Sequence, residues 1–199
     1  NTLVLDAPIV LDQGSDLKAW KPENYGKKFY GPSTLRKGIE KSRNLMTVRV
    51  AQSVGFEKIS ELSRALGIYE NVPELLSVSL GSNETTLLKL TSAYCSFING
   101  GKKIKPTLIN RIQDRRGKTI FNSENGKCLG CDKIFVEGDK KFTPKIVSDY
   151  KQVLSKETAY QITSMLEGVV QRGTGKRLKK LNLPIAGKTG TTNDNFDAW

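Results

Sequence analysis

Two short stretches of this 199-residue chain carry residue types that could do chemistry together. The first, residues 184–199, reads PIAGKTGTTNDNFDAW. On a β-strand Lys188 and Gly190 would face one way and Thr189 and Thr191 the other. A glycine inside a strand often marks the close approach of a ligand, and lysine and hydroxyl groups can hold a carboxylate. The segment predicts a strand edge that pairs with an extended peptide and binds its free C-terminus.

The second stretch, EKSRNLMTVRVAQ, covers residues 40–52 and places Ser42 and Asn44 between two helical segments. Taken by spacing alone, the pattern favours a structural role in which Ser42 or Asn44 caps the second helix. Both three-residue patterns are short: S-x-N occurs again at 123–125, and K-T-G can stand on an ordinary strand with a surface turn. The spacing therefore leaves both a functional and a structural interpretation open.

Composition removes several classes of function. The chain has no histidine, which excludes Ser-His-Asp and Cys-His catalysis and histidine-ligated zinc, so an acyl transferase would need a lysine base. The net charge of +12 predicts an anionic partner, and a basic module for wall polymer or nucleic acid is the alternative function. The basic clusters at 114–118 and 177–180 are short, and aromatic residues are only 8%, so we expect no nucleic-acid partner.

The hydrophobic periodicity predicts the elements that must position these residues. No apolar stretch approaches the roughly 18 residues that span a bilayer. Residues 1–31 read as loop with short extended pieces, and 122–144 as a polar irregular insert. We expect a helix capped by Ser33 or Thr34, a hairpin at 103–121 that turns at 114–117, and four further helices. Their positions are 45–54, 59–66, 84–98 (with Leu87, Leu90, Tyr94 and Phe97 on one face) and 155–172 (with Ala159, Ile162, Leu166 and Val169 on one face).

The two motifs together resemble the penicillin-binding transpeptidase and serine β-lactamase superfamily, which uses S-x-x-K, S-x-N and K-T-G. Three longer stretches are similar to class A penicillin-binding proteins: WKPENY…FYGPSTLRKGIEKSRNLMTVRVAQSVG, SLGSNETTLLKLTSAYCSFINGGKKIKPTLI and GVVQRGTGKRLKKLNLPIAGKTGTTND. The resemblance implies an α+β fold, with a helical subdomain packed on an antiparallel sheet. The W-x-P-x-N-Y stretch and the long segment 84–112 argue against a hydrolytic β-lactamase.

The resemblance also implies an activity and a set of roles. A family member is a serine D,D-transpeptidase that attacks the D-Ala-D-Ala bond of a peptidoglycan stem peptide, and β-lactams enter the same site as mimics. No cofactor and no metal are expected. Carried over by position, the catalytic residues are Ser42, Asn44 and Lys188, and the substrate-binding residues are Thr189, Gly190 and Thr191.

The family's nucleophilic S-x-x-K is the main departure. The matches at 15–18 (SDLK) and 148–151 (SDYK) lie in a Gly/Asp loop and after S-x-N, so we interpret both as chance matches. Residues 1–199 are expected to form a partial transpeptidase domain that is inactive alone, without the true S-x-x-K and the strands after K-T-G. The parent is expected to carry a glycosyltransferase domain and a membrane anchor, and to act on the periplasmic face of the inner membrane. The strand at 184–192 would then be an unpaired edge through which the fragment associates with itself.

The two cysteines of the insert allow two interpretations, a metal site or a disulfide. Cys128 and Cys131 supply only half of a four-thiolate zinc site. In the oxidising periplasm that the resemblance implies, a disulfide between them is expected. Cys95, on the apolar side of the helix at 84–98, is expected to be a small buried hydrophobe.

Overall fold

The computed structural model describes residues 2–12, 18–123, 127–131, 145–147 and 150–190. The chain opens with an antiparallel pair, β1 (Leu3–Asp6) and β2 (Gly31–Thr34), in which Leu3 lies opposite Thr34. The loop between them returns the chain to the start of the first helix. Short extended pieces were expected here, and the structure adds that two of them pair.

Three helices follow in close succession: α1 (Leu35–Glu40), α2 (Asn44–Val54) and α3 (Phe56–Leu66). Thr34 caps α1, because its Oγ1 accepts a hydrogen bond from Lys37 N at 3.3 Å. Gly55 and Gly67 end α2 and α3 with positive φ, a conformation that suits glycine. The predictions for this stretch are confirmed to within a few residues.

The second half of the helical part contains η1 (Leu76–Leu80), α4 (Leu87–Ile98), α5 (Lys156–Gln171) and η2 (Lys176–Leu181). Helix α4 begins later than expected because Thr86, and not a residue near 84, caps it. The predicted apolar face of α4 is wrong in part, since Leu87 is 66% exposed and the buried residues are Ala93 and Ser96. The two short 3₁₀ helices were not predicted, because each is less than two turns of α-helix long and leaves no clear period.

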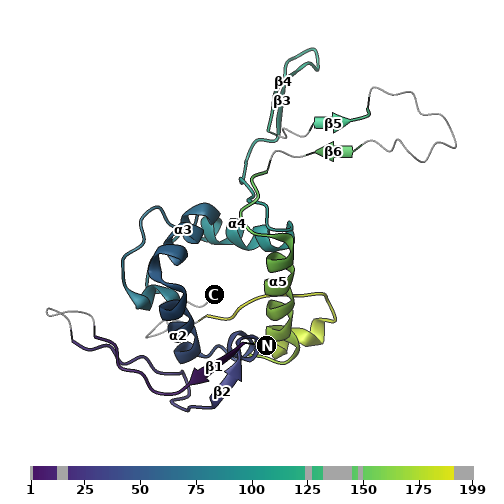
Figure 1. The fold of residues 1–199 in the computed structure, drawn as a ribbon. Coiled ribbons are helices and arrows are strands. Elements are labelled where there is room, and N and C mark those ends of the chain that lie inside the picture. Colours follow the sequence, from purple (N-terminus) through teal and green to yellow (C-terminus); the bar gives the residue numbers. More distant parts are fainter. Residues whose placement is uncertain (1, 13–17, 124–126, 132–144, 148–149, 191–199) are drawn as a thin grey trace.

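The core lies where α1, α2 and α5 meet. Leu45, Val48 and Ala51 of α2 are buried, as are Ala159, Leu166, Val169 and Val170 of α5. The predicted faces of α2 and α5 therefore point inward as expected, with Ile162 half-buried. Helices α1 to α5, with β1 and β2, form the helical body of the molecule (Figure 1). None of the described helices is both long and apolar enough to cross a bilayer.

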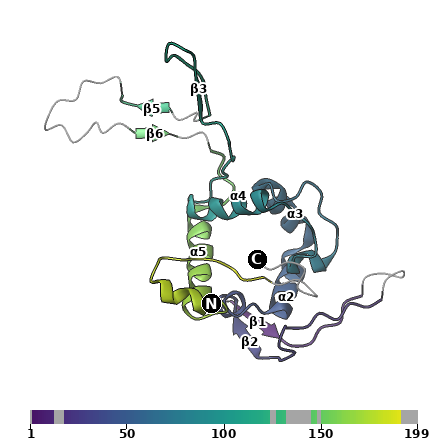
Figure 2. The same ribbon diagram turned by 180° about the vertical axis from the view of Figure 1, so that it is seen from behind.

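Two hairpins stand away from this body, and we call them the hairpin lobe (Figures 1 and 2). The first pairs β3 (Arg111–Gln113) with β4 (Thr119–Asn122), and the second pairs β5 (Lys127–Leu129) with β6 (Lys145–Val147). The predicted hairpin with its turn at 114–117 is confirmed: Asp114 Oδ1 accepts from Arg116 N and Lys118 N. The lobe joins the body at Gly101, whose carbonyl accepts from Val153 N and Leu154 N.

The fold class is α+β, as predicted, but the described strands do not form one sheet under the helices. They form three separate two-stranded antiparallel sheets. In the described part of the chain the helices consequently pack mainly on one another. The segment that positions Ser42 relies on contacts with helices and with the small β1–β2 sheet.

Candidate active site

Ser42 lies in the tight connection between α1 and α2. Its backbone has a φ of +52°, which is uncommon for a residue with a side chain. Two backbone hydrogen bonds close the turn, from Ser42 N to Ile39 O at 3.1 Å and from Arg43 N to Gly38 O at 2.9 Å. A serine held in the left-handed region marks a position where surrounding structure imposes the conformation.

The helix-capping interpretation of Ser42 and Asn44 is wrong. The N-cap of α2 is Arg43, and no side chain makes the capping hydrogen bond. Asn44 is the first residue of α2, and its Nδ2 donates to the carbonyl of Glu23 at 2.9 Å. Among the described residues, none donates a hydrogen bond to Asn44 Oδ1. Neither side chain of the S-x-N pair is therefore used to start the helix.

A buried polar network fixes the start of α2, and the sequence reasoning did not find it. Asn24 Nδ2 donates to Asp6 Oδ1 at 2.7 Å, and Asn24 Oδ1 accepts from Leu45 N at 3.3 Å. Asp6 is fully buried and lies 3.8 Å from Arg43 Nε. Arg43 also stacks on the ring of Tyr30 at 3.3 Å, and its hydrogen bond to the hydroxyl lowers the pKa of Tyr30. This network joins the loop at 23–30 to the residue between Ser42 and Asn44.

Residues at the end of α5 contact Glu40 and Lys41, which lead into the turn that carries Ser42. Arg172 forms an ion pair with Glu40, whose side chain is only 7% exposed, and this pair raises the pKa of Arg172. Lys41 Nζ donates to Arg172 O at 2.6 Å. A Cβ on Gly173 would lie 2.1 Å from the carbonyl oxygen of Glu40, so only glycine allows this approach. Glu40, two residues before Ser42, could have indicated an ion pair near the site. Its partner could not be found from local sequence, because Arg172 lies 132 residues further along the chain.

The predicted strand at the K-T-G motif is wrong for residues 184–190, which have no regular structure. The described strands all pair within their own hairpins or sheets, so none is available to this segment. Among the described residues, three hydrogen bonds tie it to the helical body: Gly187 N donates to Leu166 O at 3.3 Å, Lys188 contacts Ser42, and Thr189 contacts Thr174. Figure 1 shows this yellow segment leaving η2 and running past α5 toward α2. The expected self-association through a strand edge at 184–192 stays a prediction.

Lys188 and Ser42 meet, although 146 residues separate them. Lys188 Nζ donates to Ser42 Oγ at 2.7 Å and to the carbonyl of Thr189 at 2.8 Å. Burial lowers the pKa of Lys188, because desolvation disfavours the charged amine. The amine is therefore a better proton donor when charged than a lysine in water, and its proton is aimed at a hydroxyl.

The structure describes some of the predicted site residues near the Lys188–Ser42 pair, but not all of them. Thr189 and Gly190 are exposed beside Lys188, and Asn44 lies two residues beyond Ser42. Thr191 lies outside the described residues, as do Ser15 and Ser148 of the two chance S-x-x-K matches. In the part of the chain that the structure describes, no group of three or more His, Cys, Asp or Glu side chains could hold a metal ion.

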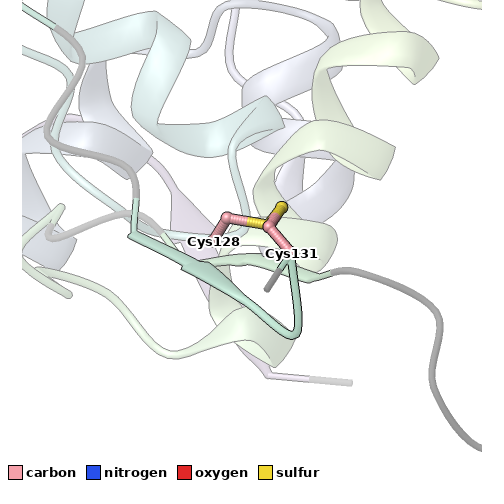
Figure 3. Close-up of a disulfide and its surroundings, with 2 residues drawn as sticks. All are labelled: Cys128 and Cys131. Carbon is pink, nitrogen blue, oxygen red and sulfur yellow. A yellow bond between two sulfur atoms is a disulfide. The ribbon is translucent and has the colours of Figure 1, made fainter. Parts of the chain in front are cut away.

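The cysteines of the insert lie in the hairpin lobe, away from this site. Cys128, at the centre of β5, forms a disulfide with Cys131, and their Cα atoms lie 5.7 Å apart (Figure 3). Cys95 is a free thiol on α4 and is half-buried, so it is less enclosed than expected.

Comparison with known proteins decides what kind of domain carries this pair. Residues 1–196 match the family model "Penicillin binding protein transpeptidase domain". The chain belongs to the penicillin-binding protein transpeptidase family. It is 44% identical to "Penicillin-binding protein 1A" of Rickettsia bellii, over all of this chain and 25% of that protein. The chain thus spans about a quarter of the length of the curated relatives that it matches.

Solved structures agree with this assignment. Penicillin-binding protein 1A from Haemophilus influenzae has a TM-score of 0.81 and 30% identity, covering 99% of this chain and 32% of that one. An imipenem acyl-enzyme complex of penicillin-binding protein A from M. tuberculosis has a TM-score of 0.68 at 19% identity, covering 96% of this chain and 43% of that one, and shows the fold alone. The helical body therefore has the fold of part of a penicillin-binding protein that is longer than this chain. The α+β fold predicted from the sequence and the family resemblance are both confirmed.

Proposed function

We propose that this chain contributes the S-x-N and K-T-G parts of a serine D,D-transpeptidase active site, which cross-links peptidoglycan stem peptides ending in D-Ala-D-Ala. The observation that carries the proposal is the 2.7 Å hydrogen bond from Lys188 Nζ to Ser42 Oγ. Two motifs that lie 146 residues apart in the sequence meet through one ammonium and one hydroxyl. That pairing is suited to proton transfer in acyl transfer.

Ser42 and Lys188 would form a relay to the leaving amine. A nucleophilic serine forms an ester with the carbonyl carbon of the donor peptide, and the bond from that carbon to the amine of the last D-alanine breaks. Ser42 gives its proton to this amine and takes one from Lys188, and the proton that the attacking serine releases to the lysine of its S-x-x-K motif would return to Lys188. The lowered pKa of Lys188 supports this direction, because it makes the ammonium a stronger acid.

The remaining motif residues would hold the substrate. Asn44 keeps its Nδ2 on Glu23 and would use Oδ1 to accept from an amide of the donor peptide. Thr189 and Thr191 would bind the terminal carboxylate, and the Thr191 N–H would be an oxyanion donor. Gly190 would let the substrate backbone come close.

The attacking serine would come from an S-x-x-K motif other than the two matches in this chain, so we propose that the isolated chain is inactive. The parent would be a bifunctional penicillin-binding protein that also carries a glycosyltransferase domain and a membrane anchor. It would act on the periplasmic side of the inner membrane, and β-lactams would acylate it. The likeness to proteins named penicillin-binding protein 1A over about a quarter of their length supports this larger protein.

Labelling with a fluorescent penicillin tests the proposal on the full-length protein that contains this chain. We expect wild type to be labelled, and Lys188→Ala and Ser42→Ala to be labelled more slowly by on the order of 100-fold. Lys179→Ala, in exposed η2, is the matched control and should label as wild type does. Labelling of Lys188→Ala at the wild-type rate would overturn the assigned relay. A wild-type protein that does not label would overturn the transpeptidase assignment itself.

A further inference from the structure

A second pair of side chains meets beside the relay. Thr174 Oγ1 and Thr189 Oγ1 lie 2.6 Å apart, and either hydroxyl could be the donor. Both residues are exposed, so this contact is no part of the core. Thr189 belongs to the K-T-G motif, whereas Thr174 lies in the turn between α5 and η2, in the stretch QRGTGKR. The sequence motifs give Thr174 no role.

The backbone of Thr174 is held firmly in place. Its N–H donates to the carbonyl of Glu40 at 3.1 Å, in the turn that leads to Ser42. Gly173 and Gly175 on either side are buried, and Gly175 N donates to Val169 O at 3.0 Å. Thr174 therefore presents its hydroxyl from the rigid junction of α1 and α5.

Thr189 lies on a segment with much less support. Residues 184–190 pair with no described strand, and the side chains of Lys188 and Thr189 provide two of the three hydrogen bonds that tie the segment to the described helical body. In the part of the chain that the structure describes, Thr174 is thus one of two side chains that anchor the K-T-G motif by hydrogen bonds. The other anchor, Ser42, belongs to the proposed proton relay.

The role of Thr174 depends on which hydroxyl donates in the hydrogen bond between Thr174 and Thr189. A threonine hydroxyl has one proton to donate and can accept hydrogen bonds on its oxygen. If Thr189 donates its proton to a carboxylate, its contact with Thr174 must run the other way, with Thr174 as the donor. A hydroxyl that accepts one hydrogen bond also becomes a stronger donor of another.

We propose that Thr174 is a positioning residue for carboxylate recognition: it donates to Thr189 Oγ1 and so directs the Thr189 proton to the free carboxylate of a peptide or β-lactam. This inference rests on the proposed function. It predicts that Thr174 matters for ligands that carry the carboxylate and not for ligands in which that group is esterified.

The experiment measures acylation of the full-length protein by benzylpenicillin and by its methyl ester. Thr174→Val keeps the shape of the side chain and removes the donor, and Thr174→Ser keeps the hydroxyl. We expect Thr174→Val to slow acylation by benzylpenicillin about tenfold and to leave the ester rate within about twofold. Thr174→Ser should restore the benzylpenicillin rate to within about threefold of wild type.

Three results would overturn the proposal. Equal losses with the acid and the ester would show that Thr174 supports the site only structurally. An unchanged benzylpenicillin rate in Thr174→Val would show that Thr189 needs no partner. Failure of Thr174→Ser to restore the rate would show that the hydroxyl is not the active group. Absence of acylation in wild type would instead count against the proposed function, which separates the two failures.

Discussion

The helical body and the hairpin lobe use the same residue types in opposite ways. In the body, Asn24 is 4% exposed and binds the fully buried Asp6, and Gly173 lets two backbones touch. In the lobe, all residues of β3 and β4 are exposed. Gly117 and Asp114 make turn contacts there, and Asn110 hydrogen-bonds Ser123 within the same hairpin. A polar residue or glycine is therefore informative about function here only when it joins segments far apart in the sequence. Pairs of identical residues, one from each region, can test this difference.

The largest effect is expected for the asparagine pair. Asn24→Ala removes the donor to a buried carboxylate and also the acceptor for Leu45 N, so we expect a loss of about 4 kcal/mol in unfolding free energy. Asn110→Ala removes only an exposed hydrogen bond from Ser123, and should change the same quantity by less than about 0.5 kcal/mol. Urea unfolding of the full-length protein measures both. Similar losses for the two variants would mean that the body and the lobe are not distinct in this way.

The glycine pair should give the next largest effect. Gly173→Ala places a Cβ against the Glu40 carbonyl, and we expect a loss of about 2 kcal/mol together with slower acylation, because the turn carrying Ser42 must shift. In the lobe, Gly117 has open space around it but a φ of +81°, so Gly117→Ala should cost about 1 kcal/mol, with acylation unchanged. The deciding measurement is acylation. A slow Gly117→Ala variant would show that the lobe communicates with the site.

Lys188 gives the body a pH dependence whose sign follows from its burial. Because the pKa of Lys188 is lower in the folded protein than its usual 10.5, the unfolded chain binds more protons between the two values. The contribution of Lys188 to unfolding free energy therefore rises with pH through that window, and is least favourable below it. Wild type minus Lys188→Met, measured by urea unfolding at increasing pH, should slope upward toward 10.5. A flat or falling difference would contradict the burial of the amine.

Local features were predictable from the sequence, and long-range pairings were not. The cap at Thr34, the ends of the helices predicted at 45–54 and 59–66, the start of the helix predicted at 155–172 and the turn at 114–117 depend on neighbours within a few residues, and the sequence placed each near its observed position. The Glu40–Arg172 pair and the Thr174–Thr189 pair depend on which helices pack together, which no local period records. Lys188 and Ser42 were assigned to one catalytic site only through the family resemblance, because the residue types alone predicted carboxylate binding for Lys188 and the spacing favoured a helix cap for Ser42.

The K-T-G segment separates a motif from the element that was predicted to carry it. Lysine, threonine and glycine suggested a strand because alternation and a bare glycine suit peptide binding on an edge. A strand, however, needs a neighbour to accept its backbone hydrogen bonds, and the described residues offer none to 184–190. The side chains of Lys188 and Thr189 still reach Ser42 and Thr174 from the irregular segment. The predicted strand was thus wrong, while the roles assigned to these side chains stay a prediction.

The smallest effect should come from the cysteines. Cys95 lies on α4 between the buried residues Ala93 and Ser96, so Cys95→Ser puts a hydroxyl in a half-buried position and should cost about 1 kcal/mol. The double variant Cys128→Ser with Cys131→Ser opens only a short loop in the lobe, and unfolding of the body should change by less than about 0.5 kcal/mol. Penicillin acylation should not change with either the double variant or a reductant. Mass spectrometry of the non-reduced protein should show Cys128 linked to Cys131 and Cys95 free.

Loss of acylation on reduction would mean that the lobe disulfide supports the active site, and the two regions could then no longer be treated as independent.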